Sequence, residues 1–163
     1  MAVTVRPMTD QEFEYFYQWS AEQYALELAG EASIPKADAL KKALSELSGM
    51  LPDGLHTANH QLMTVEETAR REAVGFIWTI YEITDGRKQC FICDFAIWEP
   101  YRRNGYATAA LHLAEAQAAR SGCTETVLFV ADRNAAAKAL YQTCGYRLLR
   151  QSGSGAYLIR QIP

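Results

Sequence analysis

The chain is organised around one joint, Asp94-Phe-Ala-Ile-Trp-Glu-Pro-Tyr-Arg-Arg-Asn-Gly-Tyr-Ala-Thr108. Its first residues close an apolar run, Phe91 to Trp98, that has the length of a strand. Pro100 cannot donate to a sheet ladder, so the strand is expected to end before it. The alanine- and leucine-rich segment from Thr108 onward is expected to be a helix that ends near Gly122. The joint therefore predicts a strand, a turn and a helix.

The chemistry that such a joint favours is anion binding. The first turn of a helix has backbone N–H groups without partners and carries a partial positive charge. Gly105 lets the backbone approach a phosphate closely, and Ala107 is nearly as small. Arg102 and Arg103 add positive charge. The order of residues excludes a Walker A loop, and a single glycine excludes a dinucleotide fingerprint.

A second segment has the same organisation. Thr124 to Ala131 is a nearly continuous apolar run, which is typical of a buried strand. Asn134 is expected to cap a helix from Ala135 to Cys144 that ends at Gly145. Asn134 and Tyr141 are seven residues apart, about two helical turns, and therefore share one face of that helix.

Both segments resemble the signatures of one family. Arg102-x-x-Gly105-x-Ala107 is similar to the Arg/Gln-x-x-Gly-x-Gly/Ala acyl-CoA pyrophosphate loop of the GNAT (Gcn5-related N-acetyltransferase) superfamily. Asn134-Ala-Ala-Ala-Lys-Ala-Leu-Tyr-Gln-Thr-Cys-Gly-Tyr146 resembles its second signature, Asn-x-x-Ala-x-x-Leu-Tyr-x-x-x-Gly-Phe/Tyr. The two occur in the family's order. The resemblance implies an N-acetyltransferase that moves an acetyl group directly from acetyl-CoA to a primary amine.

The resemblance also implies binding roles for individual residues. The backbone edge of Phe95, Ala96 and Ile97 would pair with the pantetheine arm, in a gap where two strands splay apart. The side-chain amide of Asn134 would hold the same arm. The pyrophosphate would lie over backbone amides of the loop and helix start, namely Arg102, Arg103, Asn104, Gly105, Tyr106, Ala107 and Thr108.

Two residues are the catalytic candidates. Tyr141 matches the family's frequent general acid, and a phenol is neutral at pH 7 and can donate; packing as an apolar helix residue is the alternative. Asp94 stands where many GNAT proteins carry Asp or Glu, and would be the base, directly or through water. Strand alternation places Asp94 on one face with Ile92, Ala96 and Trp98. A structural role, accepting from nearby backbone N–H groups, is an equal alternative for Asp94.

The acceptor stays open at the level of sequence. It is a small-molecule or peptide amine, and Trp78, Tyr81 and Trp98 are candidates for an aromatic pocket around it. Ribosomal-protein N-terminal acetyltransferases of the superfamily carry a catalytic Glu five residues before the Asn, and Phe129 stands there, which disfavours that activity. Other protein N-terminal or lysine acetylation remains an alternative. So does a CoA-binding module without catalysis, which needs neither Tyr141 nor a base.

Length and composition bound the remaining possibilities. With 163 residues, 49% apolar, the chain suits a single domain over 1–163. The net charge of −3 argues against a nucleic-acid partner. No apolar run reaches membrane-spanning length and the N-terminus lacks a signal-peptide core, so the cytoplasm is expected. Cys90-x-x-Cys93 has no second pair, so free thiols and no metal are expected. A homodimer is left open.

The remaining pattern predicts an α/β fold in the order β–α–α–β–β–β–α–β–α–β–β. The mixed sheet has about seven strands with helices on both faces, as the GNAT fold has. Thr9-x-x-Glu12 is a capping-box pattern for the first helix, which is expected to break between Gly30 and Ser33. Asp85-Gly86 predicts a hairpin turn. His56 and His60 are expected in a polar loop, exposed or lining the acceptor site.

Overall fold

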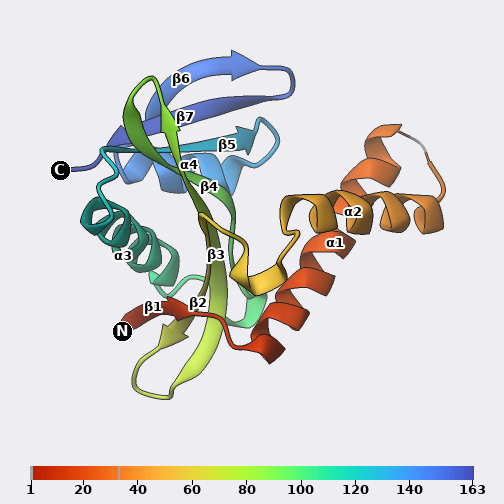
Figure 1. The fold of residues 1–163 in the computed structure, drawn as a ribbon, viewed down its shortest axis with the longest axis horizontal. Helices are drawn as coiled ribbons and strands as arrows, with labels where there is room; N and C mark the ends of the chain where they lie inside the picture. Colours follow the sequence, from red (N-terminus) through yellow and green to blue (C-terminus); the bar gives the residue numbers. More distant parts are fainter. Residues whose placement is uncertain (1, 33) are drawn as a thin grey trace. The chain divides into compact units, whose positions relative to one another are not determined.

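The computed structural model describes residues 2–32 and 34–163. The chain forms two compact units, one made of the segment up to Pro7 together with Asn59–Pro163, the other of Met8–Ala58. Figure 1 traces the elements along the chain. The strands are β1 Val3–Pro7, β2 His60–Glu67, β3 Glu72–Thr84, β4 Arg87–Ile97, β5 Glu125–Ala131, β6 Arg147–Ser152 and β7 Gly155–Gln161. The helices are α1 Asp10–Ala32, α2 Lys36–Met50, α3 Tyr106–Arg120 and α4 Ala135–Thr143, with short 3₁₀ turns η1 Gly54–His56 and η2 Glu99–Tyr101.

The first unit is built on one sheet in the order β1-β2-β3-β4-β5-β7-β6. All neighbouring strands are antiparallel except β4 and β5, which are parallel. A parallel pair needs a crossover connection, and α3 supplies it. The predicted mixed α/β sheet and the predicted order of elements are confirmed.

The main core lies between this sheet and the helices α3 and α4. Ile77 and Ile92 of the sheet, Leu111 of α3 and Tyr141 of α4 belong to one buried cluster, so both helices cover the same face. Burying a large apolar side chain stabilises a fold by roughly 1.5–3 kcal/mol. This shared core fixes α4 against α3, although the two helices are far apart in sequence.

The hairpin between β3 and β4 follows from the conformation of its two turn residues. Asp85 and Gly86 have φ angles of 52° and 74°, both in the left-handed region. A two-residue turn of this kind matches the twist of the flanking strands. The prediction of a turn at Asp85-Gly86 is confirmed, and it sets the register of β4 against β3.

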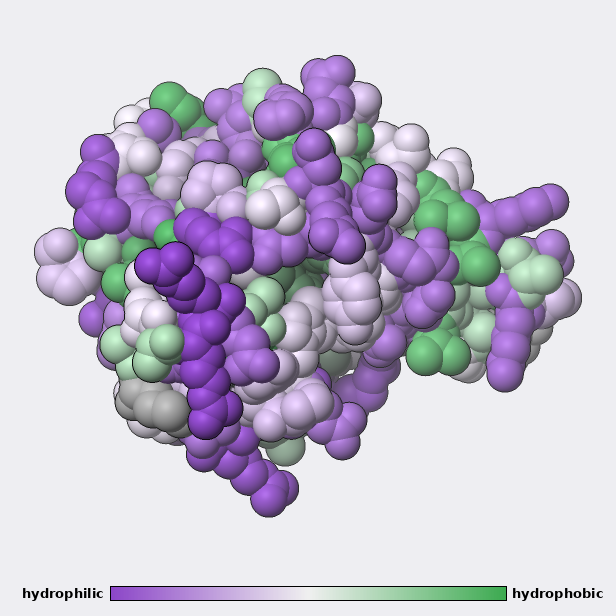
Figure 2. Space-filling model, turned by 90° about the horizontal axis from the view of Figure 1, so that it is seen from below, coloured by the Kyte–Doolittle hydropathy of each residue, from purple (hydrophilic) through white to green (hydrophobic). Residues whose placement is uncertain are grey.

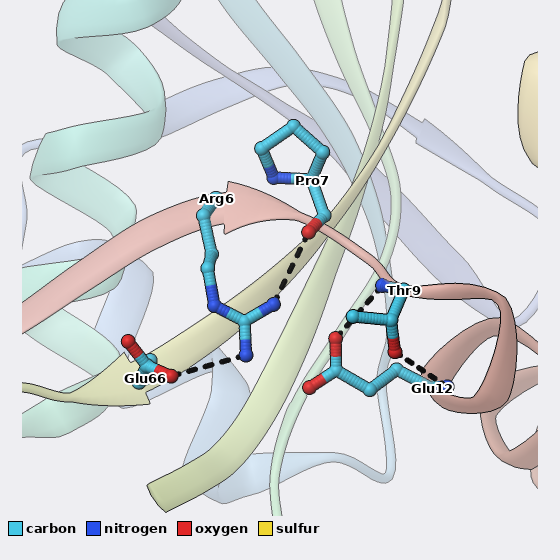
Figure 3. Close-up of polar contacts among 5 residues, drawn as sticks. All are labelled: Arg6, Pro7, Thr9, Glu12 and Glu66. Carbon is cyan, nitrogen blue, oxygen red and sulfur yellow. Dashed lines mark hydrogen bonds and ion pairs between the residues drawn. The ribbon is translucent and has the colours of Figure 1, made fainter. Parts of the chain in front are cut away.

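The second unit contains α1 and α2. Thr9 and Glu12 form the predicted capping box: the Thr9 N–H donates to Glu12 Oε1 at 2.9 Å, and the Glu12 N–H donates to Thr9 Oγ1 at 3.2 Å (Figure 3). The helix ends at Ala32, within the predicted break from Gly30 to Ser33; Gly30 itself is still helical, since a glycine costs a helix only about 1 kcal/mol. Ser33, the end of the predicted break, lies outside the described residues.

Small residues let α1 and α2 pack closely. Ala25 of α1 is buried with Ala39 and Ala43 of α2. Hydrophobic atoms also gather on the outer surface of this helical pair in Figure 2, and Leu26 is 58% exposed. Among the described residues, no helix is long and apolar enough to cross a membrane.

Candidate active site

A bulge in β4 sets the direction of the Asp94 side chain. Ile92 pairs with Thr79 of β3, whereas Asp94 pairs with Trp78, so Cys93 is an extra residue. Thr79 and Trp78 are neighbours with side chains on opposite faces, and Ile92 and Asp94 therefore also face opposite ways. The prediction that Asp94 shares a face with Ile92 is wrong, because simple alternation does not count the extra residue.

The face that carries Asp94 is aromatic. Ala96 pairs with Phe76, which lies on the Asp94 side, and the rings of Phe76 and Trp98 are 5.5 Å apart. Ala96 and Trp98 thus stay on the Asp94 face, as predicted. Trp78 lies directly across the strand pair from Asp94.

Tyr81 does not belong to that aromatic face. It pairs with Cys90 and packs against the buried cluster of Cys90, Ala118 and Cys123, on the side of the sheet that α3 covers. Of the three aromatic residues considered for an acceptor pocket, the sheet brings only Trp78 and Trp98 to the same side as Asp94. Trp78 and Tyr81 are three residues apart on β3, and residues an odd number of positions apart on a strand point to opposite faces.

The strands β4 and β5 pair over a short distance only. Their ladder runs from Gln89 with Glu125 to Ile92 with Leu128, although β4 continues to Ile97 and β5 to Ala131. Beyond Ile92, the edge of β4 that faces β5 has no ladder partner in β5. The predicted splay of these strands is confirmed.

The backbone of β4 presents only alternate residues to that open edge. Trp98 donates its N–H to Val74 of β3 at 2.8 Å, so the backbone groups of Trp98 and Ala96 point toward β3. Those of Phe95 and Ile97 point toward β5. The structure therefore brings Phe95 and Ile97, but not the Ala96 backbone, to the edge where pantetheine pairing was predicted.

Two of these backbone groups already have partners. The Phe95 N–H donates to Asp94 Oδ1 at 2.9 Å, and the Ile97 carbonyl accepts from Arg102 Nε at 2.8 Å. The first bond is the structural role considered for Asp94. The Phe95 carbonyl and the Ile97 N–H are the groups left to meet an extended ligand.

The loop between β4 and α3 is held in a tight conformation. Arg103 and Gly105 both have left-handed φ angles, 67° and 77°. The Asn104 side chain donates to the carbonyls of Tyr101 and Arg102 at 3.0 and 3.2 Å. Asn104 therefore braces the loop with its side chain, and any contact that it makes with a phosphate would come from its backbone.

The start of α3 has the features that a phosphate group needs. The first bond of the helix runs from the Ala109 N–H to the Gly105 carbonyl at 3.2 Å, so the i→i−4 bonds of α3 do not use the N–H groups of Tyr106, Ala107 and Thr108. A Cβ atom built on Gly105 meets no atom within 4 Å. The space above Gly105 is open, so the residues present fit a bound pyrophosphate. The side chain of Tyr106 is buried in the core, so it contributes only its backbone.

Asn134 caps α4 as predicted. Its Oδ1 accepts from the Ala137 N–H at 3.1 Å, and the side chain is exposed. The cap uses the acceptor atom of the amide, so the Nδ2 donors remain directed elsewhere. A donor at the start of α4 suits the carbonyl groups of pantetheine.

Tyr141 lies in the last turns of α4 and is buried, with 8% of its surface exposed. Burial raises its pKa, and the nearby Asp94 carboxylate raises it further. The phenol consequently stays protonated and able to donate. Phe95, the residue after Asp94, packs against the buried cluster that contains Tyr141, so the two catalytic candidates lie in one neighbourhood although they are far apart in sequence.

His60 has a defined partner that the sequence did not indicate. It opens β2 and is half-buried, not a loop residue, and its Nδ1 accepts from the indole N–H of Trp78 at 2.9 Å. With Nδ1 accepting, the neutral ring carries its proton on Nε2. Burial lowers the pKa of His60. His56 is on η1 and is exposed.

Sequence reasoning also missed Glu115. This carboxylate is buried in α3 and accepts from Tyr146 and Arg160. A signal was present, because Glu115 interrupts the apolar face formed by Leu111, Ala114 and Ala118. A charged residue on a buried helix face normally has specific partners.

The cysteines are free thiols, as predicted. Cys90, Cys123 and Cys144 are buried and Cys93 is half-buried. Burial raises the pKa of Cys90 to about 12, which leaves very little reactive thiolate near neutral pH. The described residues contain no group of three or more metal-binding side chains.

Comparisons with known proteins agree with this geometry. The model of the acetyltransferase (GNAT) family matches residues 9–146. An uncharacterized N-acetyltransferase of Bacillus subtilis, YycN, is 32% identical over 148 residues, which cover 90% of this chain and 94% of that protein. The crystal structure of YycN has a TM-score of 0.84 at 28% identity, covering 94% of this chain and 97% of that one.

A more distant solved structure has the same fold. The spermidine N-acetyltransferase of Vibrio cholerae, in complex with CoA and spermine, has a TM-score of 0.70 at 16% identity and covers 98% of this chain and 95% of its own. The family model spans both signatures, from the joint after β4 to Tyr146. The chain belongs to the GNAT acetyltransferase family, and it is an acyltransferase.

Proposed function

We propose that this protein transfers the acetyl group of acetyl-CoA directly to a primary amine, without an acyl-enzyme. The observation that carries the proposal is that the β4–β5 ladder ends at Ile92, and that Phe95, next to Asp94 on the unpaired part of β4, packs against the cluster that contains Tyr141. Asp94 is on β4 and its charge acts on Tyr141 of α4, and β4 leads within a few residues to the loop at the start of α3. An acid and a base beside a thioester site are what amide formation requires.

Acetyl-CoA is the proposed donor because the chain offers a partner for each part of it. The N–H groups of Tyr106, Ala107 and Thr108, together with Gly105, would hold the pyrophosphate. Phe95 and Ile97 would pair with the pantetheine arm, and Asn134 would donate to it. The CoA bound to the spermidine N-acetyltransferase of the same fold supports this donor. No metal has a part in the proposal.

The proposed reaction needs two proton transfers. The acceptor nitrogen forms a bond to the thioester carbonyl carbon, and the carbon–sulfur bond breaks. Asp94 takes the proton that the amine loses, directly or through water, and Tyr141 gives its hydroxyl proton to the departing sulfur. Its raised pKa keeps Tyr141 protonated until then. The buried thiols, with raised pKa values, are poor nucleophiles, which supports direct transfer.

The acceptor is proposed as a small-molecule or peptide amine that lies against the Asp94 face. The half-buried Trp98 gives this face apolar surface for the carbon chain of such an amine, while Trp78 is buried across the strand pair from Asp94. Phe129, where a Glu would suit ribosomal-protein N-terminal acetylation, favours another acceptor. The free cysteines suit a reducing compartment, so we place the protein in the cytoplasm.

A panel of amines tests the proposal. The purified protein is incubated with acetyl-CoA and each amine, and free CoA thiol is measured with a disulfide reagent. Spermine and spermidine belong in the panel, with amino acids, aminoglycosides and peptides. Turnover with at least one amine is expected. Tight CoA binding without thiol release for any amine would instead favour a CoA-binding module without catalysis.

A further inference from the structure

The buried carboxylate of Glu115 has two hydrogen-bond partners, Tyr146 and Arg160. Glu115 of α3 is 4% exposed. Its Oε2 accepts from the Tyr146 hydroxyl at 2.7 Å, and its Oε1 accepts from Arg160 Nη1 at 3.1 Å. Removing a carboxylate from water is unfavourable unless both oxygens are satisfied, and here both are. The three residues come from α3, from β7 and from the segment after α4, so the network joins three elements.

This network reaches Tyr141 by two contacts of Tyr146. The Tyr146 N–H donates to the Tyr141 carbonyl at 3.0 Å. The two rings lie edge to face, with centroids 5.5 Å apart. Tyr146 therefore touches both the backbone and the ring of the proposed acid, while its own hydroxyl is fixed by Glu115.

Arg160 packs against the turn that follows α4. Gly145, which ends α4, has a φ of 90°, and a Cβ atom built there would lie 3.3 Å from Arg160 Nε. The guanidinium therefore packs directly against the turn between Tyr141 and Tyr146. Arg160 is also paired with Glu115. The Glu115 carboxylate therefore holds both the Tyr146 side chain and the guanidinium that packs against the Gly145 backbone.

We propose that Glu115 is a positioning residue for the acetyl transfer, which acts through Tyr146 and Arg160 to aim the Tyr141 hydroxyl at the departing sulfur. The inference rests on the proposed function, since it needs Tyr141 as the acid. A tyrosine ring can turn about its side-chain bonds, and a general acid misplaced by a fraction of an ångström loses much of its effect. Burial and the Glu115 charge raise the pKa of Tyr146, so its hydroxyl keeps donating to Glu115 throughout the working pH range.

The test is a double-mutant cycle that combines Tyr146→Phe with Tyr141→Phe. Tyr146→Phe keeps the ring and removes only the bond to Glu115. We expect kcat to fall about 3- to 30-fold, with the KM for acetyl-CoA changed less than about twofold, since only the transition state needs the aimed hydroxyl. In the Tyr141→Phe background, the same change should have almost no further effect, because the hydroxyl that it aims is absent.

Two further variants complete the experiment. Glu115→Gln keeps an acceptor oxygen for Tyr146 but removes the charge that pairs with Arg160; its loss of kcat should also vanish in the Tyr141→Phe background. Tyr81→Phe is the matched control, because Tyr81 packs against the separate cluster of Cys90, Ala118 and Cys123, and its kcat should equal that of the wild type. Thermal unfolding is measured for all variants.

The possible results distinguish the positioning role of Glu115 from the proposed acetyl transfer itself. A wild-type protein that releases no thiol with any amine overturns the proposed function and this inference together. Normal wild-type turnover with an unchanged Tyr146→Phe variant overturns the inference alone. So does an equal fall in kcat with and without the Tyr141 hydroxyl, since that is the mark of a merely structural role.

Discussion

The two sides of the proposed site are made from different parts of the chain. The donor side, around Gly105, uses backbone groups of consecutive residues at the start of α3. The acceptor side uses side chains from separate strands: Asp94 of β4, Trp78 of β3 and His60 of β2. The first depends on local conformation, and the second depends on how strands pair.

This difference decides how each side responds to mutation. A backbone site loses affinity when a residue changes the φ angles or fills the space that the ligand needs. A side-chain site loses individual interactions, and the remaining atoms keep their places. The predictions below test whether the two sides are as separate as their construction indicates.

The largest effect is expected from Tyr141, the proposed general acid. Tyr141→Phe keeps the buried ring and removes the hydroxyl, so kcat should fall about 10- to 1,000-fold, while CoA binding stays nearly unchanged. Steady-state kinetics together with calorimetry of CoA binding measure both quantities. Equal turnover of the mutant and the wild type would return Tyr141 to a packing role.

The donor side is tested by Gly105→Val. The left-handed φ of 77° and the open space above Gly105 should make valine both strained and obstructive. We expect the Kd for CoA to rise roughly 10- to 100-fold, the cost of losing several charge-assisted hydrogen bonds. Calorimetric titration with CoA measures it.

Gly86→Val is the matched control for that change. Gly86 has a φ of 74° and equally open surroundings, but it lies in the hairpin between β3 and β4. Both variants should lose similar stability, and only Gly105→Val should lose CoA affinity. If both bind CoA as the wild type does, the pyrophosphate site is not at this loop.

The same contrast explains how much the sequence could predict. Gly105, Asn134 and Gly145 act through turn and cap geometry, which depends on neighbouring residues, and the element order that they mark is confirmed. The predicted face of Asp94 was partly wrong, because the bulge at Cys93 arises from the pairing of β4 with β3. Nothing in the local pattern of β4 shows an extra residue.

Long-range side-chain pairs were the other omission. The Trp78–His60 bond joins β3 to β2, and the Glu115 network joins α3 to β7. Only the folded sheet brings these residues together. Tyr81 shows the converse, since its aromatic character suggested a pocket and its place in the sheet assigns it to the core behind α3.

Asp94→Asn tests the acceptor side. Asparagine keeps an oxygen that can accept from the Phe95 N–H, so the structural bond survives while the base is lost. We expect kcat/KM to fall about tenfold, less than the usual loss for a general base because part of the amine arrives deprotonated. The acid side of the pH–rate profile should flatten, and the loss of charge should lower the pKa of Tyr141.

A structural role for Asp94 predicts a different result. Thermal unfolding would then occur at a lower temperature in Asp94→Asn, while the folded fraction would keep the wild-type pH profile. Measuring unfolding and pH–rate profiles on the same two proteins distinguishes these cases. A stable variant with a wild-type profile rules out Asp94 as the base, and the amine then reaches the site already neutral.

The smallest effect is expected from His60 of β2, the partner of Trp78. Its pKa is lowered by burial, so the unfolded chain binds a proton more readily than the folded protein does. The stability that the neutral ring contributes is therefore complete above the unfolded value near 6.5, and it is lost as the pH falls through the folded value. Protonation of Nδ1 would also end the bond from Trp78.

His60→Gln removes this titration and keeps an acceptor for the Trp78 N–H. Its melting temperature should fall less than that of the wild type between about pH 7.5 and about pH 5. His56→Gln is the control, since the exposed His56 on η1 has no such buried bond among those described. Calorimetric melting of the three proteins at both pH values gives the comparison. Parallel loss of stability in His60→Gln and the wild type would mean that the Trp78–His60 pair is not sensitive to pH.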